Sequence, residues 1–129
     1  MRTEALIRSY FDTWRTGNRA VMEAALTEDF TFTSLRDDHI DRQAFFDRCW
    51  PMAGSFESFD IHRILIDGDQ AIVMYDARNK TGERFHNTEI LRMSGPRIRS
   101  VEVFLGRPQS PRPAITRSTR PLAVLSLRR

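Results

Sequence analysis

The sequence contains a single cysteine, Cys49, and no run of about 18 or more apolar residues. One cysteine cannot form a disulfide within the chain, and no segment has the length and apolarity of a transmembrane helix. The amino terminus, MRTEALIRSY, lacks the basic-then-apolar order of a secretory signal peptide. At 129 residues the chain has the size of one domain. We therefore expect a soluble, cytoplasmic protein.

Familiar catalytic patterns are missing as well. The sequence has no GxSxG, P-loop, GxGxxG or HExxH motif. Cys49 precedes Trp50 in an expected helix, which favours a small core residue over a nucleophile. Asp37, Asp38 and His39 are consecutive, but three neighbours in one loop rarely form a metal site by themselves. We predict no metal ion and no cofactor.

Acidic residues are absent from the end of the chain. Residues 107–129 contain six arginines, which leaves 14 basic and all 17 acidic residues in residues 1–106, a net charge of −3. The stretch has no aromatic side chain to stack on bases and no amphipathic helical period. We predict a domain over residues 1–106 and a solvated arginine- and proline-rich extension over 107–129. A nucleic-acid-binding arm is the alternative, which we disfavour, and we expect no membrane partner.

The amino-terminal part of the chain has helical periodicity. Leu6, Tyr10 and Trp14 recur every four residues and predict one helix. Two further helices are expected over about residues 18–26 and 41–50, with a strand over 30–34 between them. The residues expected to cap or end these helices are Gly17, Asn18, Asp41 and Pro51.

From Phe56 onward the hydrophobic period changes to two. Four strands are predicted, joined by short turns at Gly68, at Thr81–Gly82 and at Gly95–Pro96. The strands are expected over residues 56–66, 70–79, 83–93 and 97–106. Short connections imply an antiparallel meander, and helices followed by consecutive hairpins indicate an α+β fold.

Parts of the predicted sheet are apolar on both faces. In the second strand of the meander, Ile72 and Met74 alternate with Val73 and Tyr75. An antiparallel sheet with one face in water would alternate apolar and polar residues instead. We therefore predict a homodimer that packs sheet against sheet.

The third strand of the meander carries the most informative polar residues. Asn87 and Glu89 share one face with Phe85, Leu91 and Met93. A buried carboxylate without a partner is costly, so Glu89 is expected to be protonated, paired or functional. The alternative is a structural role, in which these side chains bond to an arginine or to the backbone.

Four stretches resemble the nuclear transport factor 2-like superfamily, and specifically its SnoaL-like members. They are YFDTWRTGN (residues 10–18), LTEDFTFTS (26–34), IDRQAFFDRCWP (40–51) and IRSVEVFLG (98–106). The resemblance implies a cone-shaped α+β barrel in which three amino-terminal helices pack in a curved, mostly antiparallel sheet around an open apolar cavity. Its members include steroid isomerases, polyketide cyclases, dehydratases, an epoxide hydrolase and non-catalytic partners, so the fold alone does not decide function.

The resemblance also implies roles for individual residues. Tyr10 matches the tyrosine that donates a hydrogen bond to the oxyanion in ketosteroid isomerases, and Glu89 matches their protonated aspartic acid. Ser34 occupies the place of their catalytic aspartate and cannot act as a base unaided. Asp38 or His39, in the loop that follows, or a bound water is expected to move the proton instead.

The leading hypothesis is therefore a protein that binds a hydrophobic, carbonyl-bearing small molecule, with isomerase-, cyclase- or lyase-type catalysis possible through Tyr10 and protonated Glu89. A non-catalytic dimeric binding or interaction module is the main alternative, with Glu89 paired to Arg92 or Arg78. A relay of Asp76, Arg78 and Glu89 resembles the epoxide hydrolases. The expected ligand-binding residues are Trp14, Phe32, Ser34, Trp50, Phe59, Met74, Asp76, Asn87, Val101 and Val103.

Overall fold

The computed structural model describes residues 2–109, so most of the predicted carboxy-terminal extension lies outside the described residues. The described part has the predicted order, with helices before the long strands. In chain order the elements are α1 (Thr3–Thr16), α2 (Arg19–Ala25), β1 (Leu26–Thr33), β2 (Ile40–Asp41), α3 (Arg42–Arg48), a 3-10 turn (Trp50–Met52), β3 (Phe56–Asp67), β4 (Gln70–Asn79), β5 (Arg84–Ser94) and β6 (Arg97–Gln109). No helix among the described residues is long and apolar enough to span a membrane.

Short side chains and a glycine define the helix ends, as the sequence predicts. Gly17 follows α1 with a φ of 74°, a left-handed conformation that glycine adopts without a Cβ clash. The Asn18 side chain accepts a hydrogen bond from the Val21 N–H at the start of α2. Asp41 does the same for the Ala44 N–H at the start of α3. Each cap satisfies a backbone group that the helix itself leaves free.

One six-stranded sheet, in the order β2-β1-β6-β5-β4-β3, forms the body of the protein. Strands β3 to β6 form the predicted antiparallel meander. Strand β1 joins it by pairing parallel to β6, a long-range contact that local patterns do not reveal. Strand β6 continues to Gln109, so the first three residues of the predicted extension belong to the strand.

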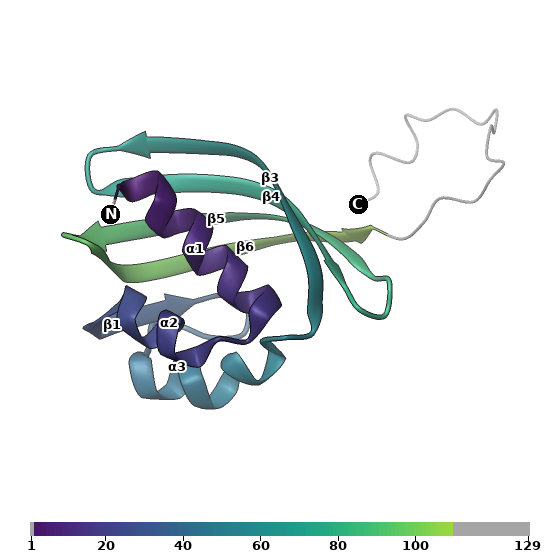
Figure 1. The fold of residues 1–129 in the computed structure, drawn as a ribbon, viewed down its shortest axis with the longest axis horizontal. Coiled ribbons are helices and arrows are strands. Elements are labelled where there is room, and N and C mark those ends of the chain that lie inside the picture. Colours follow the sequence, from purple (N-terminus) through teal and green to yellow (C-terminus); the bar gives the residue numbers. More distant parts are fainter. Residues whose placement is uncertain (1, 110–129) are drawn as a thin grey trace, which may run out of the picture.

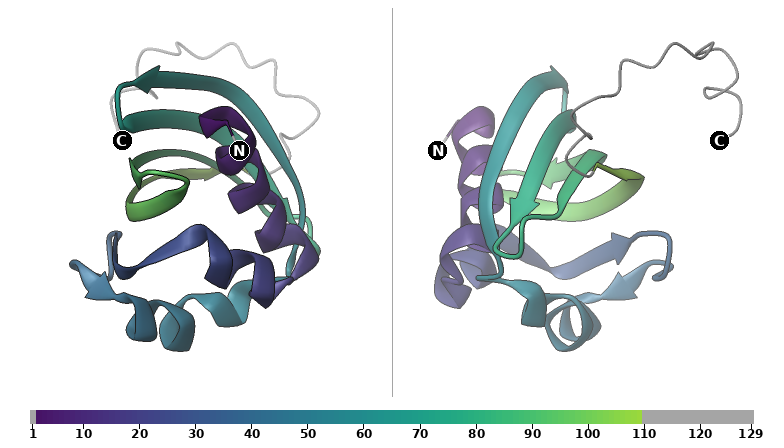
Figure 2. Two further views of the ribbon diagram at one scale, coloured as in Figure 1. Left: turned by 60° about the vertical axis from the view of Figure 1, so that its left-hand side comes forward. Right: turned by 90° about the vertical axis from the view of Figure 1, so that its right-hand side faces the viewer.

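The sheet is strongly curved, and α1 lies across its concave side (Figures 1 and 2). We call this concave side the inner face. Helices α2 and α3 lie near β1, at the opposite end of the sheet from β3. The buried face of α1 presents Leu6, Ile7, Tyr10 and Phe11 to the core, and a buried side chain of this size typically contributes about 1.5–3 kcal/mol.

The convex, outer face of the sheet also carries apolar side chains, as predicted. Ile72, Met74 and Ile90 are partly buried there, while Leu65 is 52% exposed and Phe104 is 49% exposed. Their neighbours along each strand point to the inner face. The homodimer predicted from this two-sided apolar pattern stays a prediction.

Candidate functional site

Glu89 lies on the inner face of β5, one of the central strands of the sheet. It pairs across the sheet with Val73 of β4 and with Val103 of β6. Only 5% of Glu89 is exposed to solvent, and Asn87 on the same face is also buried. The prediction that this strand projects a carboxyl group and an amide into the apolar interior is confirmed.

A chain of hydrogen bonds connects these polar groups. The Gly106 backbone N–H donates to Asn87 Oδ1 (3.0 Å), and Asn87 Nδ2 donates to the Tyr75 hydroxyl (3.2 Å). The Tyr75 hydroxyl in turn donates to Glu89 Oε2 (2.6 Å). The other carboxyl oxygen, Glu89 Oε1, is buried without a hydrogen-bond partner. We call Tyr75, Asn87 and Glu89 the inner polar cluster.

Burial determines the protonation of this cluster. It raises the pKa of Glu89 from its ordinary 4.5 to about 7, although the hydrogen bond from Tyr75 lowers that pKa. Burial, and secondarily the charge of Glu89, raises the pKa of Tyr75 and of Tyr10 well above the usual value for a phenol. The two phenols therefore stay neutral at pH 7, while Glu89 is close to half protonated.

Tyr10 comes to the cluster from α1. It is 1% exposed, and its ring packs edge-on against Phe11 (centroid distance 5.1 Å) and Trp14 (6.4 Å). Burial is the main cause of the raised pKa of Tyr10, and the charge of Glu89 raises that pKa further. The structure thus places Tyr10 and Glu89 in one interior region, but Tyr75 is the phenol that bonds to the carboxyl group.

The sequence analysis missed Tyr75 as a polar partner. The turn at Thr81–Gly82 could have indicated this partner, because the position of the turn sets which residues of β4 and β5 face each other. In the structure Arg78 pairs with Arg84 across that turn. Counting back along both strands from this pair places Tyr75 opposite Asn87. The alternative partners of Glu89, Arg78 and Arg92, make no such bond, since Arg78 instead pairs with Glu57 at 3.7 Å.

Most of the expected ligand-binding residues point to the interior. Phe59 packs against Tyr75 (5.6 Å between ring centroids), and Phe32 packs against Phe45 (5.2 Å). Trp14 contacts Trp50 (5.2 Å) near the end of α1. The predicted residues on the inner side are Trp14, Phe32, Trp50, Phe59, Asn87, Val101 and Val103. We call the four aromatic side chains of this set, Trp14, Phe32, Trp50 and Phe59, the aromatic wall, and Phe59 contacts Tyr75 of the cluster.

Met74 and Asp76 lie on the outer face, contrary to the prediction. Asp76 pairs across the sheet with His86 rather than facing Glu89. Because both faces of β4 are apolar, alternation alone does not show which face is inward. The sequence analysis assigned the face of Met74 and Asp76 to the interior, which is wrong. The relay of Asp76, Arg78 and Glu89 is therefore wrong, since its members lie on opposite sides of the sheet.

The predicted acid–base loop also lies away from the cluster. Asp38 and His39 are paired with each other (Oδ1 to Nδ1, 2.6 Å), and both side chains are largely exposed. Ser34 bonds instead to Asp37 of the same loop (3.3 Å). Asp38 and His39 therefore make no hydrogen bond with Glu89, and the proton-transfer role expected for them stays a prediction.

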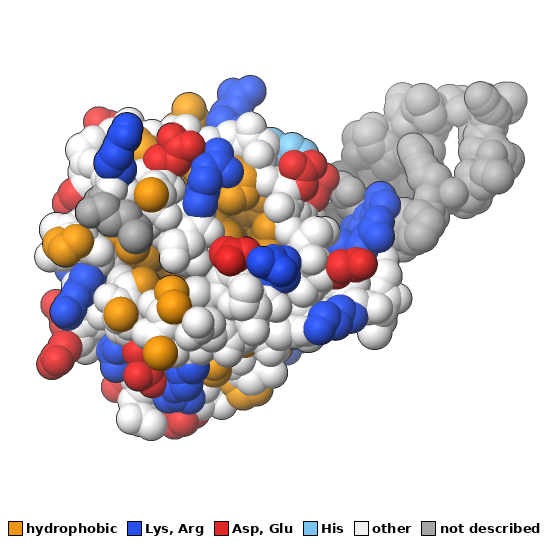
Figure 3. All heavy atoms as spheres, in the orientation of Figure 1, with side chains coloured by type: hydrophobic (Ala, Val, Ile, Leu, Met, Phe, Trp, Pro, Cys, Tyr) orange, Lys and Arg blue, Asp and Glu red, His pale blue; other side chains and the backbone are white. Residues whose placement is uncertain are grey.

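Two surface hollows lie away from the inner polar cluster. One, of about 320 Å³, opens on the outer face and is lined in part by Thr31 and His39. The other, of about 420 Å³, is lined in part by Arg42 and Phe46. Neither is lined by Glu89, so the open apolar cavity implied by the resemblance stays a prediction. On the side that α1 covers, hydrophobic side chains are visible in a recess between charged ones (Figure 3).

Known structures share this arrangement of helices and sheet. A proposed ketosteroid isomerase from Kribbella flavida is 23% identical, with a TM-score of 0.67 over 90% of this chain and 89% of that one. An NTF2-like protein of unknown function from Cytophaga hutchinsonii is 17% identical (TM-score 0.68; 82% and 91% covered). An LEH-like epoxide hydrolase from M. tuberculosis is 17% identical (TM-score 0.64; 79% and 80% covered). These identities establish the fold alone.

Comparison with curated proteins gives no match. The sequence profile of the SnoaL-like domain, in contrast, matches residues 7–101, which is more than half of the 129 residues. This range includes most of α1, the inner polar cluster and most of the sheet. The chain therefore belongs to the SnoaL-like domain family.

Proposed function

We propose that this protein binds a hydrophobic small molecule that carries a carbonyl group, and that Glu89 donates a hydrogen bond to the ligand oxygen. The observation that carries the proposal is the unpartnered Glu89 Oε1, buried beside the aromatic wall. A buried polar atom without a partner costs about 1–3 kcal/mol. A ligand oxygen at that position would recover part of this cost.

Tyr75 orients the carboxyl group for this role. Its hydroxyl donates a hydrogen bond to Oε2 of Glu89 (2.6 Å). The proton of neutral Glu89 therefore belongs on Oε1, where it is free to be donated. Asn87 holds the Tyr75 hydroxyl through its Nδ2. In a water-poor site, such a fixed donor is worth roughly 3 kcal/mol toward an oxygen that gains negative charge.

The cluster suits stabilisation of an enolate-like oxygen better than a complete proton-transfer cycle. Besides the tyrosines, the buried polar side chains among residues 2–106 are Thr13, Asp37, Asn87 and Glu89. Asp37 belongs to a different site, where it pairs with Arg48. Catalysis of the isomerase, cyclase or lyase type would therefore take its base from Glu89 itself, from water or from the ligand.

The test compares 1-tetralone with tetralin, which has the same rings without the carbonyl. Binding is followed by isothermal titration calorimetry on the full chain at pH 6 and pH 8.5. We expect 1-tetralone to bind about fivefold to tenfold more tightly than tetralin at pH 6. That preference should shrink at pH 8.5, where Glu89 is ionised and has no proton to donate.

Two variants separate the contribution of the carboxyl group to binding from that of the aromatic wall. Glu89→Leu should lose the preference for the ketone but still bind tetralin, and Glu89→Gln should lose the dependence on pH. Glu102→Gln, on the exposed outer face, is the matched control and should behave like the wild type. Equal affinity for the two ligands in the wild-type protein would refute the proposal.

A non-catalytic interaction module is a second candidate, favoured by the packing around Tyr75. The Phe11 ring lies 4.9 Å from that of Tyr75, and Phe59 lies 5.8 Å from Phe11. Rings at such distances contact one another and leave little room between them. On this alternative, neither tetralin nor 1-tetralone would bind with measurable affinity.

The proposed partner in either case is a second copy of the chain, packed through the outer face. The exposed side chains of Leu65 and Phe104 and the partly buried Ile72, Met74 and Ile90 would form the contact. Light scattering in dilute solution should give the mass of a dimer. Phe104→Glu should shift that mass to the monomer, and a monomeric wild-type protein would exclude the dimer.

A further inference from the structure

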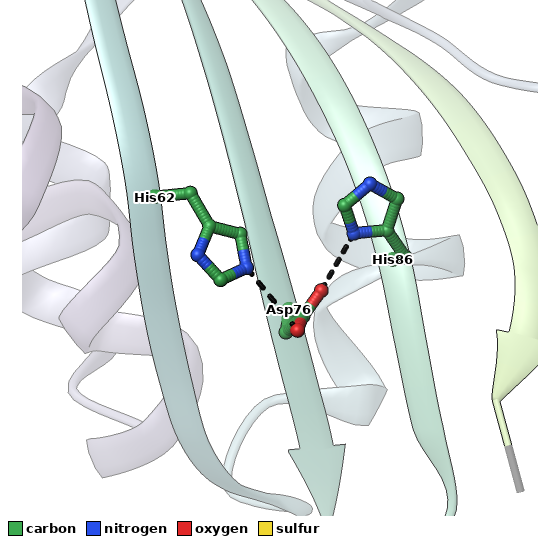
Figure 4. Close-up of side chains that lie close together, drawn as sticks. All are labelled: His62, Asp76 and His86. Atoms are coloured by element: carbon green, nitrogen blue, oxygen red, sulfur yellow. Dashed lines mark hydrogen bonds and ion pairs between the residues drawn. The ribbon is translucent and has the colours of Figure 1, made fainter.

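Three side chains with metal-binding atoms converge on the outer face, one from each of three neighbouring strands. His62 belongs to β3, Asp76 to β4 and His86 to β5 (Figure 4). His86 Nδ1 lies 2.6 Å from Asp76 Oδ1, and His62 Nε2 lies 3.1 Å from Asp76 Oδ2. One potential ligand atom from each residue lies within 4.8 Å of the other two. We call these residues the outer triad.

The strand register builds this triad. Asp76 and His86 are directly opposite each other on β4 and β5. On β3 the register shifts between Ile61 and Arg63, and His62 is the extra residue at this irregularity. Such a bulge redirects a side chain that regular alternation would place elsewhere. Here it brings His62 to the far side of the Asp76 carboxylate.

The surrounding charges favour a cation at this place. Asp60 is the cross-strand partner of Asp76, so two carboxylates on one face lie directly opposite each other, an arrangement that is destabilising by itself. The nearby Arg78 does not neutralise this pair, because it contacts Glu57 (3.7 Å). A positive ion held between the imidazoles and Asp76 would relieve the repulsion.

We propose that His62, Asp76 and His86 bind a divalent transition-metal ion of the zinc class. Two imidazole nitrogens and one carboxylate oxygen are a donor set that suits zinc, whereas magnesium and calcium prefer oxygen ligands. Ligand atoms at two corners of a tetrahedral zinc site are about 3.3 Å apart, for bonds of about 2.0–2.1 Å. The two imidazoles now contact different oxygens of Asp76, at 2.6 Å and 3.1 Å, and the three ligand atoms lie within 4.8 Å of one another, so the side chains would rotate to close around an ion.

The site is accessible to an ion and keeps one position open. In the single chain the three side chains are 42%, 39% and 44% exposed, so an ion can enter directly from solvent, and none of the three is among the residues of the proposed dimer contact. Three protein ligands leave the fourth tetrahedral position to water or to another ligand. The outer triad shares no side chain with the inner polar cluster, so this inference stands or falls independently of the proposed ligand function.

The test is a metal titration of the full chain after treatment with a chelator. Zn²⁺ binding is measured by calorimetry, and Co²⁺, a spectroscopic substitute for zinc, is followed by its visible absorption. We expect one ion per chain, with strong bands typical of tetrahedral Co²⁺ and no heat of binding with Mg²⁺. His62→Gln, Asp76→Asn and His86→Gln should each weaken Zn²⁺ binding at least about tenfold.

His39→Gln is the matched control. His39 is the one histidine of the chain's three that lies outside the outer triad. It also pairs with a neighbouring aspartate, Asp38. This variant should bind Zn²⁺ like the wild type. The proposal is overturned if the wild-type protein shows no saturable Zn²⁺ binding, if the His86→Gln variant keeps full affinity, or if His39→Gln loses as much affinity as the triad variants. Circular dichroism verifies that each variant is folded.

Discussion

The two faces of the sheet carry carboxyl groups in opposite environments. Glu89, on the inner face, is 5% exposed and accepts one hydrogen bond from Tyr75. Asp76, on the outer face, is 39% exposed and contacts two imidazoles. Burial raises the pKa of Glu89 to about 7, whereas the hydrogen bond from His86 is the main cause that lowers the pKa of Asp76. A carboxyl group thus keeps its proton to a higher pH on the inner face and loses it at a lower pH on the outer face.

The two clusters are separated by a single step along each strand. Tyr75 and Asp76 are consecutive on β4, as are His86 and Asn87 on β5. A slip of one residue in register would exchange the two faces and place charged groups in the core. The strand pairing must therefore be held firmly at this point of the sheet.

The largest expected effect concerns the pH dependence of stability through Glu89. Because its folded pKa of about 7 lies above its ordinary 4.5, the folded state holds a proton that the unfolded state has already lost. The free energy of unfolding should therefore be highest below about pH 4.5 and fall as the pH rises to about 7. The expected loss is on the order of 3 kcal/mol.

Urea denaturation of the wild type and of Glu89→Gln at intervals from pH 4.5 to 8 measures this effect. Glutamine has a similar shape and no titrating proton, so the variant should be the more stable protein at pH 8. The difference between the two proteins isolates Glu89 from the other titrating groups. Parallel curves for the two proteins over this range would show that Glu89 is ionised in the folded state at all these pH values.

The next effect concerns Gly106, which lies against the backbone of His86 where the pairing of β5 with β6 is irregular. Its N–H holds Asn87 on the inner side, and a Cβ at this position would collide with the backbone carbonyl of His86. Gly106→Ala should reduce the free energy of unfolding by about 2–3 kcal/mol, because backbone must move to make room.

Gly68→Ala is the control for Gly106→Ala. Gly68 has a φ of 64° but nothing within 4 Å of an added Cβ, so only the backbone conformation is strained. That strain costs about 1–2 kcal/mol. If the two variants lose the same stability in urea, the collision with the His86 carbonyl adds nothing to the cost of Gly106→Ala.

The comparison also shows which features local sequence patterns can and cannot predict. Helix caps at Asn18 and Asp41 depend on neighbouring residues, and both were predicted. The inward direction of Glu89 followed from alternation along one strand. The partnership of Tyr75 with Glu89 depends on the register between two strands, and β4 is apolar on both faces, so alternation did not reveal it.

Features that depend on contacts between distant segments could not be predicted from local sequence patterns either. The parallel pairing of β1 with β6 joins segments far apart in the chain, and no local pattern encodes it. The outer triad depends on an irregularity in β3 at His62, which has no signature in the sequence. The sequence analysis assigned Asp76 to the same face as Glu89 and so missed the triad.

The smallest expected effect is that of Asp76→Asn on stability in the presence of a chelator. The pKa of Asp76 is lowered in the folded protein, so its contribution is present above its ordinary value of 3.8 and is lost on acidification. The side chain is substantially exposed, and water screens its contacts with the two imidazoles. We therefore expect a loss of less than about 1 kcal/mol at pH 7 and none near pH 3.

The pKa of Asp76 is lowered and that of Glu89 is raised, so the two carboxyl groups contribute to stability in opposite directions as the pH changes. Asp76→Asn should leave the decline in stability between pH 4.5 and 7 unchanged, since that decline belongs to the buried carboxyl group. The same urea titrations used for Glu89→Gln provide the measurement. A decline that disappeared in Asp76→Asn would mean that the outer face, and not burial on the inner face, controls how the folded protein responds to pH.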